Sequence, residues 1–381
     1  MFYINISVVH RILIRRIEYL DSVLVAMSGG VDSSVAAQLV MEQGFNCSGA
    51  MMRLFVDTCR ADNSGTVEAS STVGSPLEDS AEKDARAAAR TLGIPFYVYD
   101  LTEPFFAEVV TRFISSYKNG STPNPCVDCN QHIKFGSFLA IAAESGFDCI
   151  ATGHYARIES DNGRFLLKTG LDESKDQSYM LYMLKQEQLS HAILPLGNLK
   201  KKDVREIALS QGFANADKRD SQDICFLPGG DYTGFLERSG GVARNPGRII
   251  DTDGNDLGAH EGYYHYTIGQ RRGLNISASQ AMYVCSIDPV CNSVTVGAEE
   301  SLYSKSLTAR EINLIPAEML SEPMRVTAKV RYRHSAQPAT VWQLDEYTLH
   351  VEFDEPQRAI TKGQSVVLYD GDVVVGGGKI S

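Results

Sequence analysis

The run Ser28-Gly29-Gly30-Val31-Asp32-Ser33-Ser34 decides the fold that this sequence predicts. Residues 22–27 before it are apolar, as in a buried strand, and residues 35–40 after it place apolar side chains on one helical face. A glycine-rich turn between a strand and a helix presents backbone N–H groups to an anion, and no Cβ obstructs its approach. The pattern therefore predicts a phosphate site, with hydroxyl donors from its serines and with Asp32 orienting the loop or helping to hold Mg²⁺.

This phosphate site differs from the common lysine-containing phosphate loop. The run lacks the lysine of the motif G-x-x-x-x-G-K-[ST]. It resembles instead the SGGxDS loop, or PP-loop, of the ATP pyrophosphatases. That resemblance implies that the chain holds the pyrophosphate of ATP and transfers AMP to an oxygen of its substrate, with ATP and Mg²⁺ as cofactors.

The rest of the chain alternates strand and helix patterns in its first half and changes character later. A charged, alanine-rich helix is expected over Glu78–Leu92, a proline-rich loop over Gly120–Asn130 and a strand over Cys149–Thr152. Such alternation predicts an α/β fold with a parallel sheet, whose ligands bind at the carboxyl ends of the strands. After Cys225, short alternating runs separated by turns predict antiparallel β structure.

The 381 residues suit two or three domains. The expected order is an extension at 1–20, a PP-loop ATP-binding catalytic domain (adenine nucleotide alpha hydrolase-like) at 21–216, a small, mostly β central domain at 217–300 and a C-terminal antiparallel β-barrel at 301–381. The extension is apolar with three arginines and makes a poor signal peptide. A weak amphipathic presequence is one alternative, but we favour a non-functional extension or a misassigned start.

Composition bounds the partners and the compartment. The net charge of −11 argues against a protein whose whole surface binds nucleic acid, but it allows a local basic groove. Candidate contributors to such a groove are Lys200-Lys201-Lys202, Lys218-Arg219, Arg271-Arg272 and residues 331–334. No run is long enough to span a membrane. The eight cysteines of this long chain do not resemble a secreted disulfide scaffold, which favours the cytoplasm.

Two cysteine segments stand out. Residues 122–130, Thr-Pro-Asn-Pro-Cys-Val-Asp-Cys-Asn, hold Cys126 and Cys129, and residues 221–226 hold Cys225. A zinc site would need a further ligand pair that is not evident, and a thioredoxin-like pair would lie at a helix start without flanking prolines. The third interpretation is a thiol relay, in which one cysteine carries persulfide sulfur and another resolves it. The residues alone leave zinc, redox and relay chemistry open.

Several motifs in a fixed order resemble those of one family. They are residues 27–34, 122–130, Ala151-Thr152-Gly153-His154-Tyr155, Lys175-Asp176-Gln177-Ser178-Tyr179, residues 267–274, 353–356, 363–365 and 376–378. Together they are similar to the bacterial tRNA-specific 2-thiouridylases, the MnmA family, from Ser22 to the end of the chain.

The resemblance implies ATP-dependent 2-thiolation of the wobble uridine of tRNA. ATP adenylates O2 of the base and pyrophosphate leaves, which makes that oxygen a good leaving group. Persulfide sulfur carried by Cys225 is then transferred, with Cys129 as partner, to give 2-thiouridine and AMP. A transient Cys129–Cys225 disulfide would need reduction after each turnover. The partners implied are tRNA and a persulfide donor protein or relay, without a membrane.

The resemblance also implies binding residues. For ATP these are Ala26, Met27, Ser28, Gly29, Gly30, Val31, Asp32, Ser33, Met52 and Gly153. For the target base, which must leave its stack, they are Asn124, Pro125 and Cys126. For the remainder of the tRNA they are His154, Lys175, Asp176, Gln177, Arg331, Tyr332 and Gln364.

The sequence departs from the family pattern at one position, and two rival functions are open. Some family members have Asp where this chain has Cys126, so an acid–base role there is in doubt. Cys126, Cys129 and Cys225 are alternatively the ligands of a [4Fe–4S] cluster in an iron–sulfur-dependent thiolation. The rivals are another PP-loop ATP-dependent ligase acting on a small molecule, and a non-catalytic RNA-binding or sulfur-carrier protein.

Overall fold

The computed structural model describes residues 22–55, 76–218 and 223–381, so the expected extension at 1–20 and the thiol of Cys59 lie outside the described residues. The chain divides into two compact units. The first consists of Met1–Glu108, Asp128–Gln222 and Asp372–Val374, and the second of Val109–Val127, Asp223–Gly371 and Val375–Ser381. No helix in the described ranges is long and apolar enough to cross a membrane.

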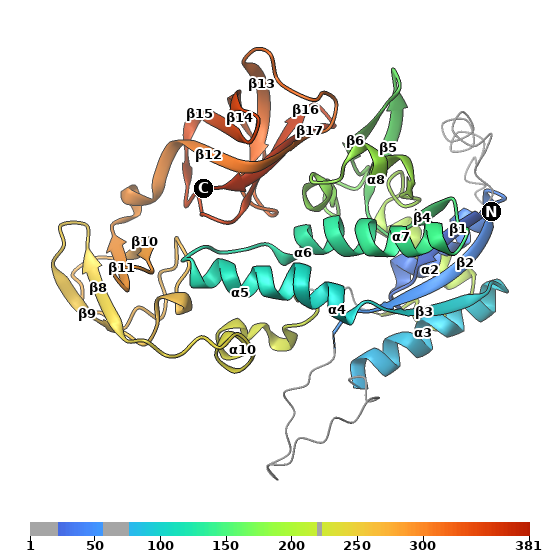
Figure 1. Ribbon diagram of the computed structural model, residues 1–381, viewed down its shortest axis with the longest axis horizontal. Coiled ribbons are helices and arrows are strands. Elements are labelled where there is room, and N and C mark those ends of the chain that lie inside the picture. The colour runs from blue at the N-terminus through green and yellow to red at the C-terminus, as the bar shows by residue number, and fades with distance from the viewer. Residues whose placement is uncertain (1–21, 56–75, 219–222) are drawn as a thin grey trace, which may run out of the picture. The chain divides into compact units, whose positions relative to one another are not determined.

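The first unit is built on a five-stranded sheet with the strand order β3-β2-β1-β4-β7. Figure 1 labels the first four of these strands. Every neighbouring pair of strands is parallel, which confirms the predicted fold class. The strands are β1 (Ser22–Ala26), β2 (Asn46–Arg53), β3 (Phe96–Asp100), β4 (Cys149–Ala151) and β7 (Ala192–Ile193).

Both faces of the central strand β1 are buried, which explains its continuous apolar sequence. Val23 and Val25 belong to a core that also contains residues of α2 (Val31–Glu42), α3 (Pro76–Leu92) and α9 (Lys201–Ser210). Leu24 lies between them, is fully buried and is not part of that core. Because side chains alternate along a strand, Leu24 faces the opposite side of the sheet.

Short helices and one hairpin make up the rest of the chain from residue 102 to 190, and residues 109–127 of this stretch belong to the second unit. They are α4 (Thr102–Phe105), the π-helix η2 (Phe106–Val110), α5 (Thr111–Lys118), α6 (Pro125–Asp128), the π-helix η3 (Cys129–Ser137), α7 (Phe138–Glu144), β5 (Ala156–Asp161), β6 (Arg164–Thr169), the 3₁₀-helix η4 (Ser178–Leu181) and α8 (Gln186–Ser190).

The loop predicted over Gly120–Asn130 is wrong in its second half. Helical structure begins at Pro125 and continues through α6, η3 and α7. Asn124 Oδ1 accepts the backbone N–H of Cys126 at 3.3 Å, so Asn124 caps the helix start. Proline is favoured at the first helical position because its missing N–H would have no helical partner there. The Asn-Pro pair thus starts a helix rather than fixing a loop.

The second unit contains a four-stranded sheet with the order β10-β11-β8-β9. Its strands are β8 (Gly247–Asp251), β9 (Asp256–His260), β10 (Tyr283–Asp288) and β11 (Ser293–Gly297). The antiparallel prediction holds for β8–β9 and β10–β11, but β11 and β8 pair in parallel. Helical segments also occur in this mostly β region: η5 (Pro228–Gly230), α10 (Tyr232–Ser239), η6 (Tyr263–His265) and η7 (Glu299–Leu302).

The C-terminal strands form the predicted barrel. They follow the order β12-β15-β14-β13-β16-β17, and a β12–β17 pairing closes the ring. The strands are β12 (Tyr303–Leu314), β13 (Met324–Lys329), β14 (Gln337–Asp345), β15 (Thr348–Arg358), β16 (Ser365–Asp370) and β17 (Val373–Ile380). Alternate apolar residues fill its core, among them Val341, Val351 and Phe353.

Candidate active site

The run 28–34 forms a closed turn between β1 and α2, as predicted. Ser33 Oγ accepts the backbone N–H of Ser28 at 3.2 Å and donates to the carbonyl of Gly30 at 3.0 Å. The first backbone bond of α2 runs from Ser34 N–H to Gly30 at 3.3 Å. The N–H groups of Val31 and Asp32 precede that bond and have no partner within the helix, so they are available to an anion.

Gly29 is the strained position of this turn. Its φ is +73°, and a Cβ built on it would overlap the backbone carbonyl of Ala81 in α3. Its own carbonyl accepts Asn215 Nδ2 at 3.1 Å and Lys218 Nζ at 3.3 Å. Glycine is therefore required here both by backbone conformation and by the close approach of α3.

Asp32 is held by side chains from far along the chain. Its carboxylate accepts Lys201 Nζ at 2.7 and 2.8 Å and the Tyr155 hydroxyl at 2.8 Å. The Lys201 side chain is 10% exposed, so this lysine does not contribute to a basic groove as the sequence predicted. Of the two roles expected for Asp32, the geometry supports orientation of the loop.

A second turn lies beside the first at the carboxyl ends of the neighbouring strands β1 and β4, as expected. A Cβ built on Gly153 would lie 2.9 Å from the backbone carbon of Asp32 and 3.0 Å from Ser33 N. The following residue, His154, is 8% exposed, which leaves little of its ring for contact with an RNA. Burial, followed by the charge of Lys134, lowers the pKa of His154 well below 6.5, so the ring is neutral.

The two neighbouring cysteines differ in exposure. Cys126 is exposed in the first turn of α6, whereas Cys129, at the start of η3, is buried at 7% exposure. A helix start favours the thiolate form of a cysteine. A thioredoxin-like redox pair would also lie at a helix start, but without the prolines that flank Asn124 here. Cys225 is exposed in the second unit.

Three other described thiols are poor nucleophiles. Burial raises the pKa of Cys47 to about 11 and raises the pKa of Cys285. A hydrogen bond to the Asp288 carboxylate raises the pKa of the exposed Cys291. Since the thiolate is the reactive form, these thiols are weak candidates for sulfur transfer.

The motif 175–177 directly follows a turn that the Lys175 N–H closes by donating to the Asp172 carbonyl at 3.0 Å. The Asp176 carboxylate accepts the N–H groups of Gly170 and Ser178 at 3.0 and 3.1 Å, and it is buried. Gln177 Oε1 accepts the N–H of Tyr155 at 3.0 Å. Asp176 and Gln177, which the sequence predicted as RNA contacts, therefore have structural partners within the first unit.

In the second unit, the segment before Cys126 is fixed by the barrel. Gln364 Nε2 donates to the carbonyls of Thr122 and Pro123 at 2.9 and 3.2 Å, and Thr122 N–H donates to the Lys362 carbonyl at 2.9 Å. Gln364 therefore positions the residues that precede the predicted target-base residues. Arg331 Nη2 donates to the Arg358 carbonyl at 3.3 Å, and Tyr332 is half-buried next to it in sequence.

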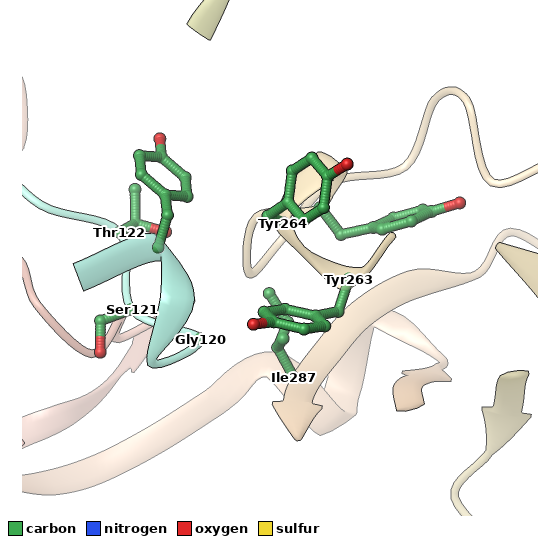
Figure 2. A pocket seen from close by; sticks show the side chains of 8 residues that line it. Gly120, Ser121, Thr122, Tyr263, Tyr264 and Ile287 are labelled. Carbon is green, nitrogen blue, oxygen red and sulfur yellow. The ribbon is translucent and has the colours of Figure 1, made fainter. Parts of the chain in front are cut away.

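Tyrosines pack around the same segment. Figure 2 shows Tyr263 and Tyr264 near Gly120–Thr122 in a pocket that Tyr117, Tyr266 and Ile287 also line. Tyr263 donates its hydroxyl proton to the Lys118 carbonyl at 2.8 Å, and Tyr264 donates to Glu237 at 3.1 Å. Burial of its ring raises the pKa of Tyr264 to about 12. Tyr264 is 2% exposed, so these tyrosines are packed against the segment at 118–122 and hold it in place.

Known proteins resemble this chain over nearly its whole length. Three family models match: the tRNA methyl transferase HUP domain at residues 21–229, the tRNA methyl transferase PRC-barrel domain at 233–298 and the aminomethyltransferase beta-barrel domain at 304–380. A tRNA-specific 2-thiouridylase MnmA of Clostridioides difficile is 48% identical over 94% of this chain and 97% of its own length. The chain belongs to the tRNA-specific 2-thiouridylase family.

Two further members of the 2-thiouridylase family show the same extent of similarity. MnmA of Halothermothrix orenii is 48% identical over 95% of this chain and 99% of its own length, and MnmA of Clostridium acetobutylicum is 46% identical over 94% and 99%. A solved 4-thiouridine synthetase–RNA complex with bound ATP is 18% identical over 54% of this chain and 44% of its own, with a TM-score of 0.33, too low to support an argument.

Sequence reasoning missed the side chains that hold the loop: Tyr155, Lys201, Asn215 and Lys218. Two of them lie in basic clusters that the sequence offered as contributors to a basic groove. The signal available in the sequence was the single acidic residue of the loop, Asp32, which needs a compensating cation once the loop folds onto a sheet.

The described residues fit ATP better than they fit a metal cluster. The turn at 28–34 offers backbone donors at a helix start, and its glycine admits a close approach. No three His, Cys, Asp or Glu side chains come together as a metal site within the described ranges. Nothing observed supports the iron–sulfur alternative.

Proposed function

We propose that this chain is a tRNA uridine 2-sulfurtransferase that uses ATP to replace O2 of the wobble uridine with sulfur. Its membership of the 2-thiouridylase family over at least 94% of the chain carries this proposal. The turn at 28–34 supports the ATP-dependent half, because its geometry suits a polyphosphate. Mg²⁺ would accompany the nucleotide, as is usual for ATP-dependent enzymes.

The first half-reaction activates the base. Residues 26–33 and Gly153 lie at the carboxyl ends of β1 and β4 and are proposed to bind ATP together with Met52 of β2. Attack of O2 on the α-phosphorus expels pyrophosphate and leaves O2 bonded to AMP. The N–H groups of the turn would neutralise charge on the phosphates. AMP is then a good leaving group from an otherwise weakly electrophilic carbon.

The second half-reaction delivers sulfur, and its residue roles rest on the family resemblance. Cys225 is proposed to carry a persulfide supplied by a donor protein or relay. The Cys129 thiolate attacks the inner sulfur, which forms the Cys129–Cys225 disulfide and releases hydrosulfide. Hydrosulfide adds to C2 and AMP leaves with the C–O electron pair and the former O2. A thiol reductant then supplies two electrons and two protons to restore both cysteines.

The remaining assignments complete the proposal. Asn124, Pro125 and Cys126 would hold the target base, and the tRNA contacts would come from the residues that the resemblance implies: His154, Lys175, Asp176, Gln177, Arg331, Tyr332 and Gln364. We also propose the division into domains at 21–216, 217–300 and 301–381. We further propose that the protein acts in the cytoplasm, where tRNA is used in translation.

Thiolation accounts for more of the chain than methylation does, although two family models carry the description tRNA methyl transferase. Methyl transfer would need neither a PP-loop nor a pair of cysteines. A small-molecule ligase would need the PP-loop but no cysteine. The three reactions therefore predict different products and different dependence on the thiols.

One assay tests the proposal. The protein is incubated with ATP, Mg²⁺, a persulfide donor and unmodified tRNA, and the nucleosides are analysed by mass. We expect 2-thiouridine, with loss of product in Cys129→Ser and in Cys225→Ser and full activity in the exposed control Cys291→Ser. Methylated uridine, or ATP cleavage without tRNA that persists in both Cys→Ser variants, would refute the proposal. Iron in the active protein, lost in Cys126→Ser, would favour the cluster-dependent alternative.

A further inference from the structure

Lys134, to which no role has been assigned so far, lies next to the neutral ring of His154. Lys134 lies in η3, and its Nζ is 3.5 Å from His154 Nε2. His154 Nδ1 lies 2.7 Å from Thr152 Oγ1. Because an ammonium group can only donate, Nε2 of the ring is the acceptor and the ring proton lies on Nδ1, which donates to Thr152. The two turn residues thus hold the ring in one tautomer that faces Lys134.

This partner leaves the charge of Lys134 uncompensated. The ring of His154 is buried and neutral, as its lowered pKa indicates. Lys201 and Lys218, by contrast, are paired with the carboxylates of Asp32 and Asp84 at 2.7 Å each. No carboxylate forms an ion pair with Lys134 in the part of the chain that the structure describes, and its side chain is half-buried. A half-buried ammonium without a counterion is unfavourable unless an anion joins it.

The location of Lys134 indicates which kind of anion would bind beside it. His154 directly follows Gly153, whose Cα lies so close to the start of α2 that an added Cβ would be 3.0 Å from Ser33 N. The Lys134–His154 pair therefore lies near the carboxyl ends of β1 and β4, where the turn at 28–34 presents its N–H groups. An ammonium and a helix start at one edge suit an anion with several oxygens.

We propose that Lys134 binds a phosphate group of ATP at this edge, with His154 as the residue that positions it. The inference rests on the proposed function in taking ATP as the ligand. As a compact point charge with three donors, the ammonium neutralises phosphate oxygens without forming a covalent bond.

The test compares nucleotide affinities among three variants. Lys134→Met removes the charge but keeps most of the chain length, Lys134→Arg keeps the charge, and Lys83→Met removes an exposed charge from α3 as a control. Binding of ATP, adenosine and tRNA is measured separately by equilibrium titration. We expect Lys134→Met to weaken ATP binding on the order of 10- to 100-fold, as for loss of a charged hydrogen bond.

Adenosine is the critical comparison, because it lacks phosphates. A merely structural defect would weaken the binding of both ATP and adenosine. Lys134→Met should leave the adenosine and tRNA affinities unchanged, Lys134→Arg should restore part of the ATP affinity, and Lys83→Met should match the wild type. Equal loss of ATP and adenosine binding, or weaker tRNA binding with normal ATP binding, would overturn the inference. If the wild type forms no 2-thiouridine while these ATP affinities differ as expected, the proposed function fails and the phosphate site stands.

Discussion

Replacing Gly29 with alanine should strongly weaken nucleotide binding, and a second glycine provides a control for the mechanism. At φ +73°, an L-residue costs about 1–2 kcal/mol. The added methyl group also overlaps the Ala81 carbonyl, and such overpacking costs roughly 1–3 kcal/mol. Together these two effects cost about 2–5 kcal/mol. Because a movement of the turn away from α3 would relieve the overlap, we expect the turn to be displaced.

Gly44, which lies two residues after the end of α2, provides the matched control. Its φ is +91°, and a Cβ built there has no atom within 4 Å. Gly44→Ala should therefore cost about 1–2 kcal/mol of folding free energy through backbone strain alone. It lies in the same unit and should leave the turn at 28–34 in place. The two variants share one source of strain and differ only in the collision with α3.

The assay combines denaturant unfolding with ATP titration and tRNA-dependent release of pyrophosphate. If Gly29→Ala displaces the turn and two N–H groups lose their phosphate, ATP affinity falls by about 100-fold or more, at roughly 1.5 kcal/mol for each bond. Gly44→Ala should bind ATP within about threefold of the wild type. Normal ATP binding by a folded Gly29→Ala, or equal loss of binding in both variants, would refute this account of the turn.

Three further predictions concern charge. Lys201→Met should destabilise the protein by about 1–2 kcal/mol, since the pair with Asp32 is only partly exposed, and adding Asp32→Asn should recover part of that loss in denaturant midpoints. Below pH 6.5 the unfolded chain protonates His154 but the folded chain does not, so unfolding free energy should fall by up to about 1.4 kcal/mol per pH unit, and less in His154→Gln; an unchanged slope would contradict this. Binding of tRNA should weaken steeply with salt in filter-binding titrations despite the net charge of −11, and a flat response would exclude a basic groove.

The first half of the fold was accessible from sequence because its signals are local. Buried parallel strands have continuous apolar sequences, and the residues that close the turn at 28–34 lie within that run. The prediction failed at Asn124-Pro125, where the same two residues suit a loop or a helix start, and the capping bond to Cys126 decides between them. Local sequence alone does not distinguish these two states.

Pairing between distant segments could not be predicted. Strands β8 and β11 are separated by more than forty residues, and nothing in either sequence specifies that they run parallel. The lysine cluster at 200–202 illustrates the same limit for side chains. Lys201 starts α9 and contacts Asp32 across 169 positions, whereas Lys202 is 82% exposed. Burial of one lysine and exposure of its neighbour follow from the helix face that packs against α2.

These distant contacts explain why the turn at 28–34 favours anions although it contains an aspartate. The Gly29 carbonyl is taken by Asn215 and Lys218, the Gly30 carbonyl by Ser33 and Ser34, and the Asp32 carboxylate by Lys201 and Tyr155. With these acceptors matched by internal donors, the turn presents mainly N–H groups and a helix start to a ligand. The local motif supplies the donors, but residues 155–218 suppress the competing acceptors. The fit of this turn to an anion is therefore a property of the folded unit and not of the seven-residue run alone.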